Sequence, residues 1–176
     1  TLLAGNLLGP AAAGQFRLAR EISTVLTRPA ALLRDVLFPD LTRAWHSKDP
    51  KFRKLQFRTS AIAGSAGLLI VIFAWFAGES LLALVGEDYV PAKPLMVLLL
   101  FAASFEMASA PFRAAAYAMG KAAMLLRIHA VGVGFYIVIF YLVTGHIGLI
   151  GPGLASVATS ILTFTLTASL ITRMQK

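Results

Sequence analysis

Charged side chains interrupt an apolar stretch near the beginning of the chain, residues 7–39. A charge at the centre of a bilayer costs at least roughly 2.5–3.5 kcal/mol on insertion scales, so such groups usually face a bundle interior or a water-filled cavity. Guanidinium groups match the geometry of phosphate and carboxylate groups, so they could bind an anionic ligand. The stretch therefore predicts a polar binding surface inside a membrane. Its charged residues are Arg17, Arg20, Glu21, Arg28, Arg34 and Asp35.

The spacing of these residues predicts a helix over residues 11–38 with one polar face. At 100° per residue the stripe contains Arg17, Glu21, Thr24, Arg28 and Asp35, with Arg20 and Arg34 on its edge. Apolar side chains such as Leu18 and Ile22 fall on the opposite side. We interpret the helix as one wall of a transport cavity. An amphipathic helix of a soluble protein, or one lying flat on a membrane, would show a similar stripe.

A second polar stripe lies within the apolar residues 95–119. Glu106 is near its middle, Arg113 follows seven residues later on the same face, and Tyr117 continues the stripe. One interpretation is a second cavity wall, with Glu106 paired to a cation such as Arg28. Another is a carboxylate that titrates, since burial raises the pKa of a Glu and a nearby Arg lowers it. The alternative is a fixed ion pair that joins helices and has no role in transport.

Other polar residues indicate structure rather than chemistry. The hydroxyls of residues 154–172 fall along one side, where they more often bond their own backbone or pack against a neighbour than bind ligand. His46, His129 and His146 are far apart and do not show the spacing of metal ligands. The chain has no Cys, and no nucleotide-binding, zinc-hydrolase or nucleophile-elbow motif. We therefore expect a protein that is not an enzyme and needs no metal or cofactor.

The composition is that of an integral membrane protein. Of 176 residues, 58% are hydrophobic and 14% charged, against about 25% charged in soluble domains, and the mean hydropathy is +0.77. We predict an all-α membrane bundle in one domain, residues 1–176, with about five transmembrane helices. The predicted spans are residues 11–38, 59–77, 95–119, 122–143 and 154–172. A basic connector, residues 40–58, should form a short interfacial helix.

The basic residues alternate between the predicted loops. The connector, the turn at Lys121 and the C-terminal residues carry most of them, whereas the loop at 78–94 has Lys93 alone and the turn at 144–153 has none. The positive-inside rule then places the connector and the C-terminus in the cytoplasm. The net charge of +8 could also indicate nucleic acid, but cations in short loops between apolar runs favour a membrane protein that does not bind it. An odd number of spans, together with a first residue other than Met, suggests a fragment of a longer protein.

Several segments, in order along the chain, resemble bacterial oligosaccharide and lipopolysaccharide flippases. They are LLGPAAAGQFRLAREISTVLTRPAALLRDVLFP from Leu7, GEDYVPAK from Gly86, PFRAAAYAMGKA from Pro111, and GHIGLIGPGLASVATS from Gly145. Phe16 stands where the family usually has Tyr. The resemblance implies the multidrug/oligosaccharidyl-lipid/polysaccharide exporter superfamily, whose members place two six-helix bundles around a cavity. This chain would be most of the C-terminal bundle.

The resemblance further implies the location, substrate and partners. The location would be the bacterial inner membrane. The substrate would be an oligosaccharide linked to undecaprenyl pyrophosphate, moved to the periplasmic leaflet by alternating access, and the partners would be membrane lipids and the missing half of the transporter. The cavity residues would be Arg17, Arg20, Glu21, Thr24, Arg28, Glu106, Arg113 and Tyr117. A cation-coupled multidrug exporter, a membrane-embedded polymerase or glycosyltransferase, and a purely structural subunit remain alternatives.

Overall fold

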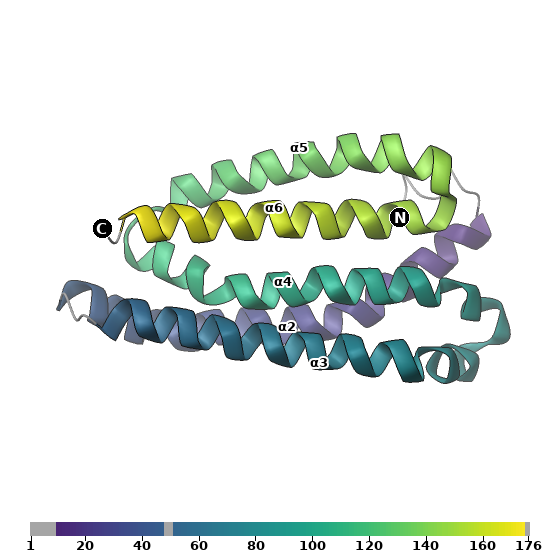
Figure 1. Ribbon diagram of the computed structural model, residues 1–176, viewed down its shortest axis with the longest axis horizontal. Helices are drawn as coiled ribbons and strands as arrows, with labels where there is room; N and C mark the ends of the chain where they lie inside the picture. The colour runs from purple at the N-terminus through teal and green to yellow at the C-terminus, as the bar shows by residue number, and fades with distance from the viewer. Residues whose placement is uncertain (1–9, 48–50, 175–176) are drawn as a thin grey trace.

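The computed structural model describes residues 10–47 and 51–174, and the regular elements within them are all helices (Figure 1). Two short 3-10 helices, η1 (Glu87–Ala92) and η2 (Gly148–Ile150), directly precede α4 and α6. The protein is an all-α membrane bundle, as predicted. Its long helices are α2 (Pro10–His46), α3 (Lys51–Val85), α4 (Lys93–Ala118), α5 (Ala122–Ile147) and α6 (Gly151–Met174).

Helix α4 is the central element of the bundle. It packs against α2, α3 and α6, whereas α5 packs mainly against α6 (Figure 1). The most apolar window of Glu87–Ala118 is 67% buried, against 22% for the window in Phe52–Val85. A side chain on α4 can therefore face several neighbours, whereas much of α3 and α5 faces outward.

Small residues allow α3 and α4 to approach closely. A Cβ atom added to Gly67 would lie 2.8 Å from the Cβ of Ser104, and one added to Gly64 would lie 3.2 Å from the Cβ of Ala108. One turn before Gly64, the Ser60 hydroxyl donates a hydrogen bond to the Ala108 carbonyl at 2.7 Å. Small residues and interhelical hydrogen bonds commonly drive helix association in membranes.

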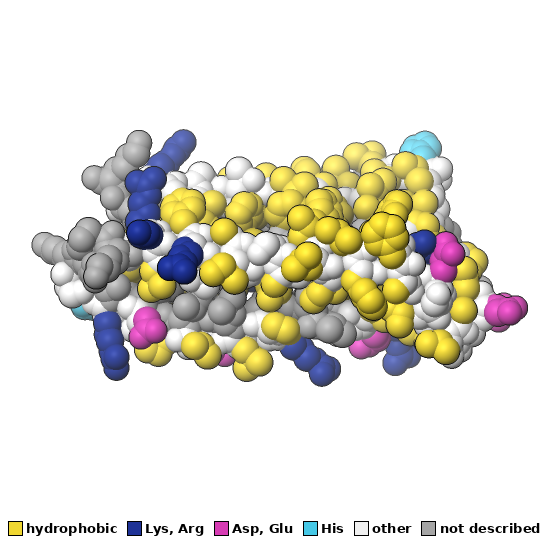
Figure 2. All heavy atoms as spheres, turned by 60° about the horizontal axis from the view of Figure 1, so that its bottom comes forward, with side chains coloured by type: hydrophobic (Ala, Val, Ile, Leu, Met, Phe, Trp, Pro, Cys, Tyr) yellow, Lys and Arg dark blue, Asp and Glu magenta, His cyan; other side chains and the backbone are white. Residues whose placement is uncertain are grey.

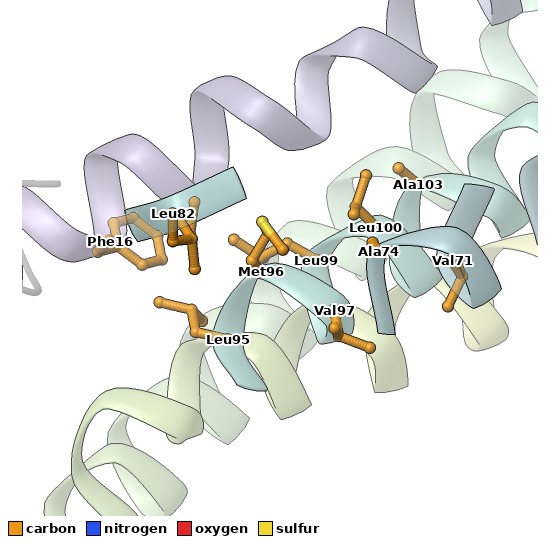
Figure 3. Packing of buried hydrophobic residues seen from close by; sticks show 11 residues of the cluster. Phe16, Val71, Ala74, Leu82, Leu95, Met96, Val97, Leu99, Leu100 and Ala103 are labelled. Atoms are coloured by element: carbon orange, nitrogen blue, oxygen red, sulfur yellow. The ribbon is translucent and has the colours of Figure 1, made fainter. Parts of the chain in front are cut away.

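Two buried clusters hold the helices at opposite ends. The first joins α2, α3 and α4 and includes Phe16, Leu82 and Met96 (Figure 3). The second joins the start of α3 to the start of α5 and the end of α6 through Phe52, Leu125 and Ile171. These contacts bring residues from distant parts of the sequence to the same end of the molecule.

The prediction of a separate interfacial helix over residues 40–58 is wrong. Residues 40–46 belong to the end of α2 and residues 51–58 to the start of α3, while residues 48–50 lie outside the described part. The prediction treated Pro39 as a helix terminator. A proline removes one backbone hydrogen bond, yet α2 continues through both Pro29 and Pro39. Neither of the two segments contains Gly or a further Pro, so nothing in them interrupts helix formation.

The other helix boundaries agree in part with the prediction. Helix α3 continues to Val85, well beyond the predicted end at residue 77, and η1 occupies much of the predicted loop at 78–94. The turn between α4 and α5 was predicted at Gly120 and Lys121. It is confirmed there, because Gly120 has a φ of 71°, a conformation that favours glycine.

Three helical runs among the described residues are long and apolar enough to cross a membrane: Phe52–Val85, Glu87–Ala118 and Ala122–Met174. The last consists of α5 and α6, which form a hairpin at η2. Helix α2 is not among these runs, so its crossing of the membrane stays a prediction. Large apolar side chains on α3 and α5 are exposed, including Phe76 at 79% and Leu126 at 72%, and Figure 2 shows hydrophobic side chains over much of the visible face. Such surfaces suit contact with lipid.

Candidate functional site

A groove of about 240 Å³ lies between α4, α5 and α6, near the middle of each helix. Most of its surface is apolar, but polar groups from all three helices reach it. Ligand sites commonly combine an apolar lining with a few polar groups in this way. Its lining residues are Glu106 of α4, His129, Gly132, Val133 and Tyr136 of α5, and Thr159 and Thr163 of α6.

Glu106 is paired with Arg113 of the same helix. Arg113 Nη1 donates to Glu106 Oε2 at 2.6 Å, and Nη2 donates to the Glu106 carbonyl at 3.0 Å. The side chains are partly buried, with 17% of Arg113 and 38% of Glu106 exposed. Their spacing of two turns puts them on one face, as predicted. The structure thus does not support an ion pair between Glu106 and Arg28 of α2. Helical side chains lean toward the N-terminus, so Arg113 reaches back along α4 to Glu106.

The two residues of the ion pair lie on either side of a proline in the sequence of α4. Pro111 lies between Glu106 and Arg113, and α4 remains helical through it. Because Pro has no backbone N–H, the carbonyl four residues before it loses its usual helical partner. Side chains hold the backbone around this position: Arg113 bonds the Glu106 carbonyl, and Ser60 of α3 bonds that of Ala108. These two bonds flank Met107, the residue whose carbonyl Pro111 leaves without a helical donor.

The charged face of α2 is exposed. Phe16, Ala19 and Ser23 form its buried face, whereas Arg17, Arg20, Glu21 and Arg28 are exposed. Thr24 is partly buried, and its hydroxyl donates to the Glu21 carbonyl at 2.6 Å. The predicted amphipathic character of α2 is thus confirmed for these side chains. The Arg34 side chain lies outside the described part.

Arg20 of α2 does not line the groove, but its charge has a weak electrostatic effect on one residue that does. The charge of Arg20 acts on the hydroxyl of Tyr136, which stands on α5 beside Ser156 of α6. Glu106 is the one predicted site residue among the residues that line the groove, and Arg113 reaches the groove through its bond to Glu106. The other predicted site residues are not in the lining: Arg17, Arg20, Glu21, Thr24, Arg28 and Tyr117.

The hydroxyls of α6 mainly bond their own helix, as expected. Thr163 donates to the Thr159 carbonyl at 2.9 Å, and Thr167 donates to the Thr163 carbonyl at 2.7 Å. Thr159 differs, because its buried Oγ1 has no hydrogen-bond partner within the described residues, and the same is true of Arg113 Nε. Buried polar atoms usually have a partner, so these two atoms could bind a ligand group or a water molecule.

The sequence analysis did not predict that residues of α5 line the groove. His129 was treated as a residue of the membrane edge, and Tyr136 was not considered. The two are seven residues apart with Gly132 between them, which is the spacing of one helical face. That periodicity could have identified these lining residues, but it gives no indication of which helices stand opposite.

The one carboxylate among the residues that line the groove is paired with a cation. Arg113 neutralises Glu106, so the groove has no uncompensated carboxylate among its described lining residues. Within residues 10–47 and 51–174, no three His, Asp or Glu side chains gather in a way that could hold a metal ion. The lining therefore holds no unpaired carboxylate that would repel an anionic group.

Comparison with known proteins gives one informative similarity. Over 100 residues the chain is 33% identical to the inner membrane protein YghQ of Escherichia coli (strain K12), a match that covers 54% of this chain and 27% of that protein. The chain thus matches about a quarter of the relative's length. No protein-family model and no solved structure matches the chain. Together with its long apolar helices, this similarity to an inner membrane protein identifies the chain as a membrane protein.

Proposed function

We propose that the chain is part of a transporter that moves an oligosaccharide linked to undecaprenyl pyrophosphate across the bacterial inner membrane. The observation that carries the proposal is the charge balance of the groove region. Its acid, Glu106, is neutralised by Arg113 at 2.6 Å, and the exposed face of α2 carries Arg17, Arg20 and Arg28. A site with surplus cationic charge suits a phosphorylated head group. The resemblance to flippase segments supports the same substrate class.

The physical problem of such transport fits these residues. A pyrophosphate is strongly anionic and must cross roughly 30 Å of hydrocarbon. Cationic side chains in a wet cavity lower that barrier, and the planar fork of Arg matches phosphate oxygens. In this proposal the exposed Arg17, Arg20 and Arg28 hold the phosphates, the polar groups of the groove contact the sugar, and the lipid tail remains in the bilayer. The second half of the transporter would close the cavity over α2, and rocking of the halves would give alternating access.

A cation-coupled multidrug exporter of the same superfamily is the second candidate. Such a protein would attract cationic drugs with an uncompensated carboxylate in an apolar, aromatic pocket. The groove has the apolar lining and Tyr136, but its carboxylate is already paired. The charge balance thus favours the lipid-linked substrate. A membrane polymerase or glycosyltransferase would require a carboxylate free to act in catalysis, and the pairing of Glu106 makes that role less suitable.

The proposed topology places the C-terminus in the cytoplasm. Exposed basic residues lie at the end of the bundle that contains the α4–α5 turn and the end of α6, whereas Glu79, Glu87 and Asp88 lie near the other end. This distribution agrees with the positive-inside rule for an inner membrane protein.

The proposal is tested by neutralising the arginines in the full-length protein inside its host. We expect the triple variant Arg17→Gln, Arg20→Gln and Arg28→Gln to lose polysaccharide export while the protein still inserts into the membrane. Lys93→Gln is the matched control, since it removes a cation whose partner is the exposed Glu79. Full export by the triple variant would contradict the proposal. Resistance to cationic drugs, with no export of polysaccharide, would support the second candidate instead.

A further inference from the structure

Six exposed cations surround one end of the bundle. Three lie in the first turns of α3, two flank the start of α5, and one lies at the end of α6. We call them the cationic collar. Its members are Arg53, Lys54, Arg58, Lys121, Arg127 and Arg173.

Buried contacts hold the collar together. Phe52, Leu125 and Ile171 belong to a single buried cluster, and each is next to or within a few residues of a collar cation in the sequence. The first turns of α3 and α5 and the last turn of α6 are therefore fixed at the same end of the molecule. Figure 2 shows Lys and Arg side chains gathered at its left end, where Figure 1 places the C-terminus.

The collar cations form no ion pairs with carboxylates of the described residues. The cations that do form ion pairs there are Lys93 and Arg113. At the opposite end, by contrast, Lys93 Nζ lies 2.9 Å from Glu79 Oε1. The collar thus gathers six exposed cations that have no carboxylate partner among the described residues.

The surroundings of the collar place it at the level of lipid head groups. The Trp45 and Phe52 rings pack at a tilt of 51° with their centroids 5.5 Å apart, and the Arg53 guanidinium lies 5.7 Å from the centroid of Phe57. Aromatic rings with basic residues are enriched where a membrane protein meets the water interface. The exposed Leu126, at 72%, directly precedes the collar residue Arg127. Exposed apolar side chains that suit contact with lipid therefore lie directly beside the collar cations.

We propose that the cationic collar binds the phosphate groups of anionic phospholipids in the adjacent leaflet. Lipid is the occupant that these observations favour, because the cations adjoin exposed apolar side chains that would contact the acyl chains of the same lipid molecules. Basic side chains close to an anionic membrane surface each contribute about 1 kcal/mol, which corresponds to about a fivefold preference. The proposal does not depend on the transported substrate.

Binding of defined lipids to the purified full-length protein tests the proposal. We would measure the affinity for phosphatidylglycerol and phosphatidylcholine by native mass spectrometry in detergent. The unmodified protein should prefer phosphatidylglycerol, and the variant Arg53→Gln, Lys54→Gln and Arg58→Gln should reduce the preference at least fivefold. The variant Arg53→Lys, Lys54→Arg and Arg58→Lys, which keeps the charges, should retain it, as should Lys93→Gln.

Three results would overturn the proposal. The unmodified protein could bind both lipids equally, or the neutralised variant could keep the full preference. Finally, inorganic phosphate or a single-stranded oligonucleotide at physiological salt could compete fully with phosphatidylglycerol, which would show a general anion or nucleic-acid site rather than a lipid site.

Discussion

Arg113 holds Glu106 from two turns away on the same helix, and the two hydrogen bonds that join them cross the position of Pro111. One bond reaches the carboxylate and the other reaches the backbone carbonyl of the same residue. Arg113 therefore neutralises a carboxylate that lines the groove, and it also bonds the backbone of α4. This arrangement relates the chemistry of the site to the stability of the central helix.

The pair predicts unequal effects of removing either partner. Arg113→Gln leaves a partly buried carboxylate without its cation, so it should destabilise the protein by about 1.5–3 kcal/mol, the range for hydrogen bonds to charged groups. Glu106→Gln keeps an acceptor for Arg113 and should cost less. Thermal unfolding in detergent measures both, and a double-mutant cycle isolates their coupling. A coupling energy near zero would show that the two side chains do not support each other.

Two glycines of α5 predict opposite outcomes from the same substitution. A Cβ at Gly132 would lie 2.7 Å from Thr163 Cγ2, whereas one at Gly134 would meet no atom within 4 Å. Gly132→Ala should therefore force α5 and α6 apart and destabilise the protein by about 1–3 kcal/mol. Gly134→Ala should be neutral or stabilising because alanine favours the helix. Equal melting temperatures for the two variants would contradict the close contact of α5 with α6.

Removal of the Thr159 hydroxyl should change transport without reducing the stability of the protein. Its Oγ1 has no partner within the described residues, so Thr159→Val removes no hydrogen bond from the protein and should leave the melting temperature unchanged. If the hydroxyl binds a substrate group, transport should fall about two- to tenfold, the value of one neutral hydrogen bond. Thr163→Val is the control, because that hydroxyl bonds the Thr159 carbonyl. Unchanged transport in Thr159→Val would exclude the hydroxyl from substrate binding.

The positions of the charged ends predict the topology. The chain contains no Cys, so single cysteines can be introduced at Lys54, Lys121 and Glu87 without a background from native thiols. An impermeant thiol reagent added to intact cells should label the residue at position 87 and leave the other two unlabelled until the membrane is opened. Labelling of all three from the same side would contradict the assignment.

The sequence predicted the helices better than their ends. Long apolar runs with small residues indicated α3, α4, α5 and α6, because burial in lipid requires helices of that length. The end of α2 was missed because Pro39 was treated as a terminator, although packing and neighbouring residues can carry a helix through a proline.

The site was only partly predictable for a different reason. The spacing of Glu106 and Arg113 showed that they share a face, but a helical pattern does not determine whether a charge bonds within its own helix or across to another. The groove depends on which helices stand together. His129 and Tyr136 show the spacing of one face, yet only the packing of α5 on α6 places them opposite Thr159.

The central claim is that the protein transports an anionic, lipid-linked oligosaccharide by means of the arginines on α2. The most direct test reconstitutes the full-length protein in liposomes that contain a prenyl-pyrophosphate-linked oligosaccharide, and follows its appearance on the opposite leaflet with an impermeant sugar-modifying enzyme. We expect the unmodified protein to move the lipid. The Arg17→Gln, Arg20→Gln and Arg28→Gln variant should be at least about tenfold slower, because each charge-assisted bond to phosphate contributes about 1.5–3 kcal/mol. Equal rates for the two proteins, or for protein-free liposomes, would contradict the claim.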